Sequence, residues 1–396
     1  MSKIQKVLIV GGGFGGVKTA LSLANDPHFD ITLLSNDNEL KYYPTLYREA
    51  TGGSKANSEL PLNNIFEQTN VNVEIGSAIS LDRHAKLIHT EEGRDYPYDY
   101  LVLALGVVTN YFNIPGLSEY SYGIKSQAEV AEFKKHLHDQ LTNDHQPDLN
   151  YIIVGAGPTG IELAGALPNY LKKLMANHSI NNKNIHIDLV EAMPRLLPNL
   201  PKQISRSVRR RIKQLGIKLF LNSKVEGETA DALTVNGKPL TSHTVIWTAG
   251  VTNHPFFKEN SFVIMGRGKV AVDIYLQSEP GIFVIGDNAN TPYSGMAQTA
   301  LHDGAFVASN LRRIVRNNKF KSYKAKLPIS VIPVGNKWAS VIWRRIYFSG
   351  YFGYLVREAA DIRGFHELEP WSSAIKQYLS EFVNQEDCPV CALKNN

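Results

Sequence analysis

Cysteine is nearly absent from this chain of 396 residues, since the only two, Cys388 and Cys391, stand close to its end. The residues before them hold no disulfide and no thiolate that could relay electrons, which favours a reducing compartment. A CxxC pair supplies only two of the four ligands that structural zinc takes. We therefore expect a dispensable tail and no metal site, with half of a shared zinc site or a redox pair as alternatives.

Long hydrophobic runs and strong charge are also lacking. No run of about 18 apolar residues occurs, so we expect no membrane-spanning helix. MSKIQK leads directly into a predicted strand, so we expect no secretory signal. With 42 basic and 37 acidic residues the net charge is +5, which is too small to favour nucleic acid as a partner. The length suggests two or three domains.

What the sequence does contain is a glycine-rich turn, and it contains this turn twice. KVLIVGGGFGGVKTA, at 6–20, and YIIVGAGPTGIELAG, at 151–165, each join an apolar strand pattern to a helical pattern. The glycines at GxGxxG spacing are Gly11, Gly13 and Gly16 in the first cradle, and Gly155, Gly157 and Gly160 in the second. This spacing permits a tight turn, a close approach of pyrophosphate to the backbone, and close helix–strand packing. The phosphates then face free N–H groups at the helix start. Two matches in these contexts predict two dinucleotide sites.

The acidic residue expected after each cradle differs between them. IHIDLVEAMPRLLP ends a predicted strand at Glu191, whose carboxylate would hold a ribose 2′-hydroxyl and repel a 2′-phosphate. NAD is therefore favoured over NADP, although Arg195 nearby weakens this preference. In ITLLSNDNEL, Ser35 stands at the acidic position. Its hydroxyl can bond a ribose, but less strongly than a charged acceptor.

Strand and helix patterns alternate along the chain, which indicates an α/β architecture. NVNVEIGSAISLD, KLIHTEE and YDYLVLALG are predicted strands that complete the first nucleotide unit. VTNYFNIPGLSEY contains proline and glycine and is predicted to cross between domains. The second unit runs to HTVIWTAGVTNHP, strands return in GKVAVDIYLQSEPGIFVIGDNAN, and a helix follows at 297–315.

These motifs carry a family resemblance. The paired cradles, with ALG at 104–106, TAG at 248–250 and IGD at 285–287, resemble the two-dinucleotide-binding-domain flavoproteins. KYYPTLYREATGG, YDYLVLALGVVTNYFNIPG, GPTGIELAG and AQTALHDG are similar to type II NADH:quinone oxidoreductases. The resemblance implies FAD in the first cradle and NADH in the second. It further implies hydride transfer from NADH to FAD, followed by electron transfer to a membrane quinone, without proton pumping.

Missing cysteines separate related families. Glutathione-reductase-like enzymes and sulfide:quinone reductases rely on cysteines near the flavin, whereas this chain has none before Cys388. Two alternatives stay open. One is an NAD(P)H flavoprotein reductase of the apoptosis-inducing-factor type, or one serving a soluble acceptor. The other is a nucleotide-sensing binding protein whose flavin turns over too slowly to matter.

The resemblance also implies domains and binding residues. An FAD domain is expected in two parts, 1–112 and 256–326, with an NADH domain at 113–255 inserted between them and a C-terminal membrane-association or dimerisation region at 327–396. The expected FAD-site residues are Gly11, Gly13, Phe14, Gly15, Gly16, Ser35, Asn36, Ala78, Ala104, Gly106, Gly286, Asp287, Ala297 and Gln298. The expected NADH-site residues are Gly155, Gly157, Pro158, Thr159, Gly160, Glu191, Ala249 and Gly250.

Three residues are expected to act in the reaction. In the resembled family, a Glu at the position of Glu162 lies beside nicotinamide and flavin, although the helix dipole alone would also favour a carboxylate in a first helical turn. Gln298 is expected to contact a quinone carbonyl. His302 stands where the family usually has a second Gln, and could donate a hydrogen bond or proton to quinone. A histidine satisfied by a neighbour is the alternative.

The last part of the chain combines basic and aromatic residues. Residues 311–326 hold seven basic side chains and no acid. In KWASVIWRRIYFSGYFGYLV, helical spacing of Trp343, Tyr347, Tyr351 and Tyr354 predicts a helix lying on a membrane surface, with ordinary core or a dimer interface as alternatives. A final helix is predicted in HELEPWSSAIKQYLSEF. The apolar face of this last helix would comprise Leu368, Trp371, Ile375, Tyr378, Leu379 and Phe382. We expect a homodimer, peripheral on the cytoplasmic face of the cell membrane.

Overall fold

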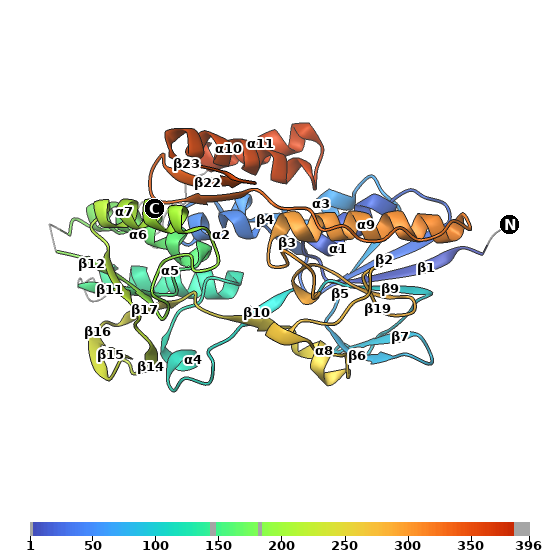
Figure 1. The fold of residues 1–396 in the computed structure, drawn as a ribbon, viewed down its shortest axis with the longest axis horizontal. Helices are drawn as coiled ribbons and strands as arrows, with labels where there is room; N and C mark the ends of the chain where they lie inside the picture. Colours follow the sequence, from blue (N-terminus) through green and yellow to red (C-terminus); the bar gives the residue numbers. More distant parts are fainter. Residues whose placement is uncertain (1–2, 143–147, 181–183, 384–396) are drawn as a thin grey trace.

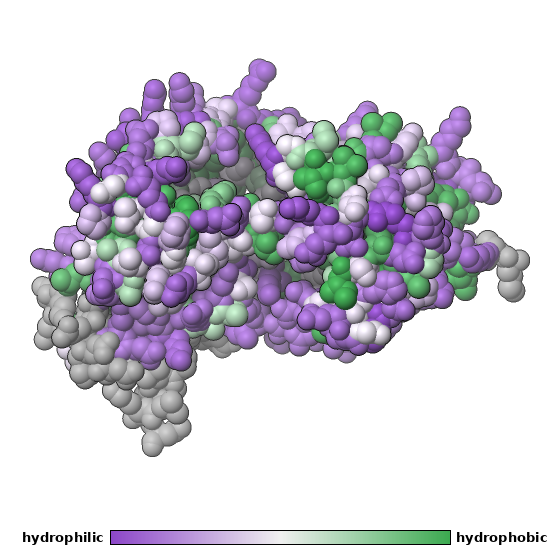
Figure 2. Space-filling view, turned by 90° about the horizontal axis from the view of Figure 1, so that it is seen from below, coloured by the Kyte–Doolittle hydropathy of each residue, from purple (hydrophilic) through white to green (hydrophobic). Residues whose placement is uncertain are grey.

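The two glycine-rich turns belong to two α/β units that lie side by side (Figure 1). The computed structural model describes residues 3–142, 148–180 and 184–383. The unit with the first turn, called here the first domain, is on the right in Figure 1, and the second domain is on the left. Helices near the C-terminus lie across the top. Seen from below, the surface is mostly hydrophilic and is hollowed between the two domains (Figure 2).

A six-stranded sheet forms the centre of the first domain. The order across this sheet is β19 (Gln277–Glu279), β20 (Ile282–Val284), β9 (Tyr100–Leu103), β1 (Gln5–Val10), β2 (Phe29–Ser35) and β5 (Val71–Ile75). β1 pairs in parallel with β2 and with β9, and β9 pairs in parallel with β20. The chain therefore leaves this sheet after β9 and returns to it at β19, with the second domain in between.

Two helices pack together on one face of this sheet. They are α1 (Phe14–Leu23), which follows the first cradle, and α9 (Ala297–Val315). Their backbones come close where Gly304 meets Gly15: a Cβ added to Gly304 would lie 2.5 Å from the Gly15 carbonyl oxygen. Glycine at 304 therefore permits this approach, which brings the start of α9 to the first cradle.

A four-stranded parallel sheet forms the centre of the second domain. Its order is β13 (Lys218–Leu221), β12 (His186–Glu191), β11 (Asn150–Val154) and β17 (Thr244–Trp247). The accompanying helices are α5 (Gln127–Thr142), α6 (Pro158–Asn177) and α7 (Lys202–Gln214). A small antiparallel sheet of β14 (Val225–Glu228), β15 (Ala232–Val235) and β16 (Lys238–Thr241) extends from it. The two connections between the domains pair with each other as β10 (Val107–Thr109) and β18 (Val251–Asn253).

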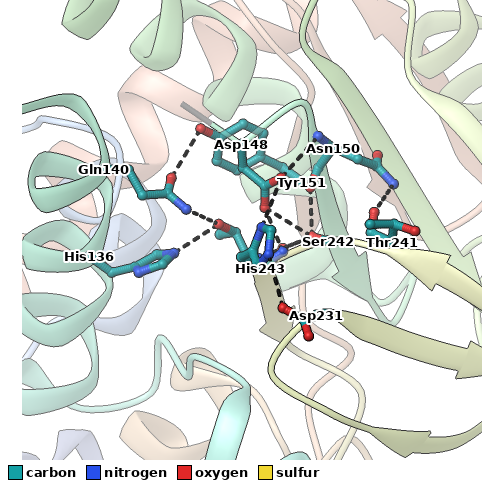
Figure 3. Close-up of polar contacts among 10 residues, drawn as sticks. His136, Gln140, Asp148, Asn150, Tyr151, Asp231, Thr241, Ser242 and His243 are labelled. Carbon is teal, nitrogen blue, oxygen red and sulfur yellow. Dashed lines mark hydrogen bonds and ion pairs between the residues drawn. The ribbon is translucent and has the colours of Figure 1, made fainter. Parts of the chain in front are cut away.

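Polar side chains fasten α5 to β17, the edge strand of the second sheet (Figure 3). His136 Nε2 lies 2.9 Å from Thr244 Oγ1, and Gln140 Nε2 donates to the same oxygen at 3.2 Å. At the start of the strand, Ser242 Oγ donates to the Asn150 carbonyl oxygen at 2.6 Å. Because Thr244 is fully buried, these bonds satisfy a polar group that would otherwise be unpaired in the core.

The strands predicted after the first cradle are present, but they divide between two sheets. β5 and β9 join the parallel sheet. β6 (Ala78–Asp82) and β7 (Leu87–Thr90) instead pair with each other in a separate antiparallel sheet, in which β7 also pairs with β8 (Asp95–Pro97). The strand pattern alone does not reveal this division, because antiparallel and parallel strands of this length use the same residue types.

The helix predicted across 337–356 is wrong for most of its length. Residues 339–350 form a hairpin of β22 (Ala339–Trp343) and β23 (Ile346–Gly350), which pairs with β21 (Ser330–Pro333). Trp343 is opposite Ile346, so two arginines form the turn, and Arg344 has a φ of 56°. The spacing of the aromatic residues fits a helix, but aromatic and β-branched residues also favour strands. A two-residue turn between two such strands is typical of a hairpin.

In this C-terminal part of the chain, the helices come after the hairpin. α10 (Tyr351–His366) starts directly after Gly350, whose φ of 109° favours glycine. α11 (Trp371–Val383) lies where the last helix was predicted. Phe365 of α10 stacks on Tyr42 with ring centroids 4.3 Å apart, so these helices belong to the packed structure. In the described residues, no helix is long and apolar enough to cross a membrane. Cys388 and Cys391 lie outside those residues.

Candidate active site

The first cradle has the backbone geometry that its spacing predicts. Gly11 has a φ of 115°, and a Cβ there would lie 2.2 Å from the Ala104 carbonyl oxygen. A Cβ at Gly16 would lie 2.0 Å from the Gly11 carbonyl oxygen. By contrast, a Cβ at Gly13 would meet nothing within 4 Å. Two glycines are therefore required by the fold, while the space above Gly13 is open for a ligand's pyrophosphate.

The second cradle repeats this geometry. Gly155 has a φ of 104°, and a Cβ there would lie 2.7 Å from the Cα of Ala249. A Cβ at Gly160 would lie 1.9 Å from the Gly155 carbonyl oxygen, whereas Gly157 again faces open space. α6 starts at Pro158, directly after the open glycine, as α1 starts at Phe14. Both cradles thus fit a dinucleotide, and each carries its helix start beneath the open position.

The two acidic positions differ in what their side chains bind. The Glu191 carboxylate accepts hydrogen bonds from the main-chain N–H groups of Ala156 and Met193, both at 2.8 Å. It therefore lies against the second cradle. Ser35 is buried against the first cradle, because a Cβ on Gly12 would lie 2.3 Å from its Oγ. Its hydroxyl accepts only a long 3.3 Å bond from the Asp37 N–H.

The guanidinium of Arg195 binds the loop that follows Glu191. It donates to the main-chain carbonyl oxygens of Leu197, at 3.3 Å, and Leu200, at 2.7 Å, and also to that of Pro198. These bonds hold the loop that follows Glu191. Part of the Arg195 guanidinium is therefore already bonded, which weakens the expectation that Arg195 reduces the preference of Glu191 for NAD over NADP. A cavity of about 150 Å³ beside this loop is nonetheless basic, and its lining residues are Arg195, Leu196, Lys202, Ser205, Arg206, Arg209 and Leu221.

The segment that contains Gly286 and Asp287 lies next to the first cradle. A Cβ on Gly15 would lie 3.1 Å from Ile285, and Asn288 Oδ1 accepts from the Gly106 N–H at 2.9 Å. Lys269 Nζ donates to the Asp287 carbonyl oxygen at 2.8 Å. These contacts bring together three distant stretches of the first site, at 11–16, 104–106 and 285–288. Ala78 is the outlying member, on β6 of the separate sheet, and Asn36 is exposed beyond β2.

Lys125 is a candidate residue that the sequence did not reveal. Its ammonium lies 5.0 Å from the centre of the Tyr43 ring, which starts α2 (Tyr43–Glu49). Burial lowers the pKa of Lys125, and the negative charges of Asp287 and Glu129 oppose this shift. Among the described residues, no acceptor lies within hydrogen-bonding distance of the ammonium. A single Lys before a predicted helix carries no local signal, so only the fold places it near Asp287.

Glu162 lies in a buried cluster of charges. It is the fifth residue of α6, beyond the first turn, so the helix dipole does not by itself account for it. Its Oε1 is 4.0 Å from Arg357 Nη1 of α10. Burial raises the pKa of Glu162 to about 7, with Arg357 lowering it and Asp361 raising it again. Asp361 itself pairs with Arg357 and with Arg48, each at 3.0 Å. The sequence gave no indication of these partners, because they come from α2 and α10.

Gln298 and His302 face the extended segment that follows α9. Gln298 Nε2 donates to the Ile329 carbonyl oxygen at 3.0 Å, and Gln298 Oε1 accepts from the Ile329 N–H at 3.2 Å. His302 Nε2 lies 2.9 Å from the Lys324 carbonyl oxygen. Both side chains therefore hold this segment along the helix. For His302 this supports the alternative that a neighbour satisfies it.

Asp303, the residue after His302 in α9, is a buried carboxyl that links the same segment to the first site. Asp303 is fully buried and accepts from the Gly286 N–H at 3.0 Å and from the Tyr323 hydroxyl at 2.5 Å. Burial raises the pKa of Asp303 to about 6. Asp303 thus fixes the turn that presents Asp287, and it is a second residue that the sequence did not single out.

Two cradles of the same geometry, with a third strand–turn segment closing the first, define a protein with two dinucleotide-binding domains. The model of the family described as pyridine nucleotide-disulphide oxidoreductase matches residues 5–304, and the chain belongs to that family. It has none of the family's namesake disulfide chemistry before Cys388, because no cysteine occurs there.

Individual relatives are similar over nearly the whole chain. The type II NADH:quinone oxidoreductase of Staphylococcus epidermidis is 27% identical over 398 residues, which cover 94% of this chain and 98% of that protein. The fold is similar to that of NDH2 from Plasmodium falciparum in complex with NADH, with a TM-score of 0.86 and 20% identity over 96% of this chain and 98% of that one. It is also similar to the sulfide:quinone oxidoreductase of Aquifex aeolicus, with a TM-score of 0.77 and 21% identity over 97% and 98%.

Proposed function

We propose that this protein is a type II NADH:quinone oxidoreductase, which passes hydride from NADH to FAD and then two electrons to a membrane quinone without pumping protons. The observation that carries this proposal is the pair of cradles, each with open space above its second glycine, in a chain without thiols before Cys388. Two bound dinucleotides allow direct transfer between them. The name of the similar staphylococcal protein supports the same activity.

FAD belongs to the first domain in this proposal, which comprises residues 1–112 and 256–326, and NADH to residues 113–255. FAD, when bound, supplies the two-electron acceptor for the hydride of NADH. The open backbone at Gly13 would bind its pyrophosphate, and Asp287 would accept hydrogen bonds from its ribityl chain. The ammonium of Lys125 needs an acceptor and is within electrostatic range of Asp287, so it would bind an oxygen or nitrogen of the flavin ring.

Glu162 is suited to hold a proton for the reaction. A carboxyl with a pKa of about 7 is half protonated at neutral pH and can both give and take a proton. Arg357, at 4.0 Å, stabilises the ionised form without enforcing it. Gln298 and His302 would meet the quinone only if the segment at 324–329 leaves them, because both side chains now bind its backbone.

Contact with a membrane is supported by a set of exposed apolar side chains near the C-terminus, called here the C-terminal apolar face. Its members are Trp343, Ile346 and Tyr347 of the hairpin, Tyr351, Phe352 and Leu355 of α10, and Trp371, Ile375 and Leu379 of α11. Phe352 is 75% exposed, which is unusual for a large apolar side chain on a soluble surface. Arg344 and Arg345 in the hairpin turn add charge that suits anionic lipid. We propose peripheral binding at the cytoplasmic face of the cell membrane, by a homodimer.

Three measurements on the purified full-length protein test the activity. A yellow protein with stoichiometric FAD is expected, and stopped-flow mixing with NADH should bleach it. Reoxidation by a long-tailed quinone should then exceed reoxidation by ferredoxin-type or other soluble acceptors. Faster reoxidation by soluble acceptors would favour the apoptosis-inducing-factor type of reductase. Bleaching that takes minutes would favour a nucleotide sensor and exclude the proposed enzyme.

A further inference from the structure

α7 of the second domain has a composition that the proposed reaction does not explain. Its 13 residues, KQISRSVRRRIKQ, contain six cations and no acid. Ile204, Ser205, Val208 and Ile212 face the core. The cations are Lys202, Arg206, Arg209, Arg210, Arg211 and Lys213. Lys202, Arg206 and Arg209 also line the cavity beside Arg195, whereas Arg210 and Lys213 are exposed outside it. The side of the helix away from the core is therefore basic, and it is called here the basic face of α7.

These cations are almost entirely without acidic partners. Arg211 donates to the carbonyl oxygens of Val334 and Asn336, at 3.2 Å and 3.1 Å. Across the described residues, none of the other five cations of α7 lies within 4.0 Å of a carboxylate. Many other basic residues do pair, including Arg83 with Glu279 at 2.9 Å. Six like charges on one short helix repel each other, so the arrangement costs stability unless an anion binds it.

The position of α7 connects this charge to the C-terminal apolar face. Ser207 of α7 hydrogen-bonds to Ser349 of β23 at 2.9 Å, and Arg211 holds the turn that leads into β22. In Figure 1, α7 lies along the upper edge of the second domain, on the side where α10 and α11 lie. The lower side is mostly hydrophilic, with scattered hydrophobic patches (Figure 2). α7 is therefore a direct neighbour of the hairpin that carries Trp343 and Tyr347.

We propose that the basic face of α7 is a docking surface for anionic phospholipid headgroups, so that the second domain itself contacts the membrane. This inference rests on the proposed function, because it assumes that the C-terminal apolar face meets the lipid. Phospholipid satisfies both features together: an apolar interior for Trp343 and its neighbours, and headgroup phosphates for the cations of α7. An acidic protein partner would not require the adjacent aromatic side chains to be exposed.

The C-terminal apolar face and the basic face of α7 would then contribute to membrane binding in different ways. The apolar face binds bilayers of any charge, whereas α7 adds affinity only for anionic ones. Each cation near an anionic surface changes partitioning by roughly fivefold at moderate salt. The contribution of α7 is screened as salt rises, because it acts across an aqueous layer. Docking of α7 would also fix the orientation of the second domain over the bilayer.

The test uses the full-length protein with its flavin and compares vesicles of neutral phosphatidylcholine with vesicles that also contain phosphatidylglycerol. The variant Arg210→Glu with Lys213→Glu reverses two charges on the exposed side of α7, outside the cavity-lining set. We expect its partitioning onto anionic vesicles to fall by roughly 20-fold or more at low salt, and onto neutral vesicles to stay unchanged. Flavin content and NADH oxidation with a soluble acceptor should be unaffected.

A matched control reverses two charges elsewhere. Lys238→Glu with Lys258→Glu changes exposed residues of β16 and α8 (Pro255–Glu259), which lie on the lower side in Figure 1, and gives the same net charge. If this control loses as much anionic binding as the α7 variant, only net charge matters and the inference is wrong. Equal binding by the α7 variant and the parent overturns it as well. Arg210→Gln with Lys213→Gln gives a milder second variant with the same expected direction.

The proposed anchor and α7 can fail separately. Trp343→Glu with Tyr347→Glu should weaken binding to both kinds of vesicle. If this hairpin variant binds as the parent does, the proposed apolar anchor is wrong, whatever α7 does. If the hairpin variant loses neutral binding while the α7 variant keeps all anionic binding, the anchor stands and the α7 inference falls. Tighter binding of the α7 surface to single-stranded RNA than to anionic vesicles would also overturn the lipid assignment.

Discussion

The two cradle domains share a backbone and differ in the charges around it. Gly11 and Gly155, the first glycines, have φ values of 115° and 104°, and both second glycines face open space. Seven residues after the first glycine, however, the first helix carries Lys18 and the second carries Glu162. The same position in the same motif thus holds opposite charges.

Both side chains pair with residues of the same C-terminal helix or its end. Lys18 Nζ lies 2.7 Å from Glu367 Oε2, directly after α10, whereas Glu162 lies 4.0 Å from Arg357 within α10. The first pair is close and partly exposed. The second is loose and buried, and the pKa of Glu162 is raised to about 7. One motif position therefore serves as a structural tie in one domain and as a titrating group in the other.

The largest expected effects come from filling the two open positions. Gly13→Val should abolish FAD retention, because the side chain would occupy the place of the pyrophosphate. Gly157→Val should leave FAD in place but abolish flavin reduction by NADH. Flavin content after gel filtration and stopped-flow bleaching measure the two outcomes. A Gly13→Val protein that keeps stoichiometric flavin would falsify the assignment of FAD to the first cradle.

The pair at the shared helix position gives the next largest effect. Below pH about 7 Glu162 is mostly protonated, so quinone reduction that uses this proton should slow as pH rises through 7. Glu162→Gln should lower the rate by about a hundredfold and remove this inflection. Lys18→Met is the matched control, and it should cost at most about 1 kcal/mol of stability without changing the pH profile. An unchanged inflection in Glu162→Gln would assign the proton to another group.

How far the sequence could predict this molecule depends on whether a feature is local. Both cradles, Glu191 and the Gly286–Asp287 turn follow from short motifs, and the family match over 5–304 confirms the predicted resemblance to two-dinucleotide-binding flavoproteins. Arg357 and Lys125 could not be found this way, because their relation to the site exists only after distant helices pack. The hairpin at 339–350 does not follow from the sequence for another reason. Aromatic residues four apart fit both a helix and a strand, and only the turn at Arg344 distinguishes the hairpin from a helix.

The residues at the acidic positions, Glu191 and Ser35, also differ between the two domains, and a smaller effect is expected from changing Glu191. Glu191 should make NADH the better donor by kcat/KM, and Glu191→Ala should narrow the gap between NADH and NADPH by about tenfold. Replacement by Ser, which copies Ser35 of the first domain, should have a similar effect. Steady-state rates with both nucleotides measure this. Equal use of NADPH by the unmodified protein would show that the basic cavity beside Arg195, and not Glu191, governs the choice.

The smallest expected effect compares two buried carboxyls. Asp303 of the first domain has a donor on each oxygen, whereas Glu228 of the second domain is 7% exposed and its Oε2 has no partner among the described residues. Burial raises the pKa of Glu228 to about 8. The folded protein therefore binds a proton there that the unfolded chain releases near pH 4.5, so stability falls as pH rises from about 4.5 to 8.

Glu228→Gln should remove this loss. Near pH 4 the carboxyl of Glu228 is mostly protonated in both the folded and the unfolded chain, and a protonated Glu and a Gln are alike in shape and charge, so the variant and the parent should unfold at similar temperatures. At alkaline pH the parent buries an ionised carboxylate without a full set of donors, and the variant should be more stable by about 1 to 3 kcal/mol. Burial also raises the pKa of Asp303, so its effect on stability has the same sign, but Asp303→Asn should gain less at alkaline pH, because the amide loses one acceptor that Gly286 or Tyr323 uses. Thermal unfolding of the three proteins at acid and alkaline pH measures the difference. If Glu228→Gln changes the unfolding temperature equally at both pH values, the carboxyl of Glu228 does not titrate in this range. The proposed difference between the buried carboxyls of the two domains would then be wrong.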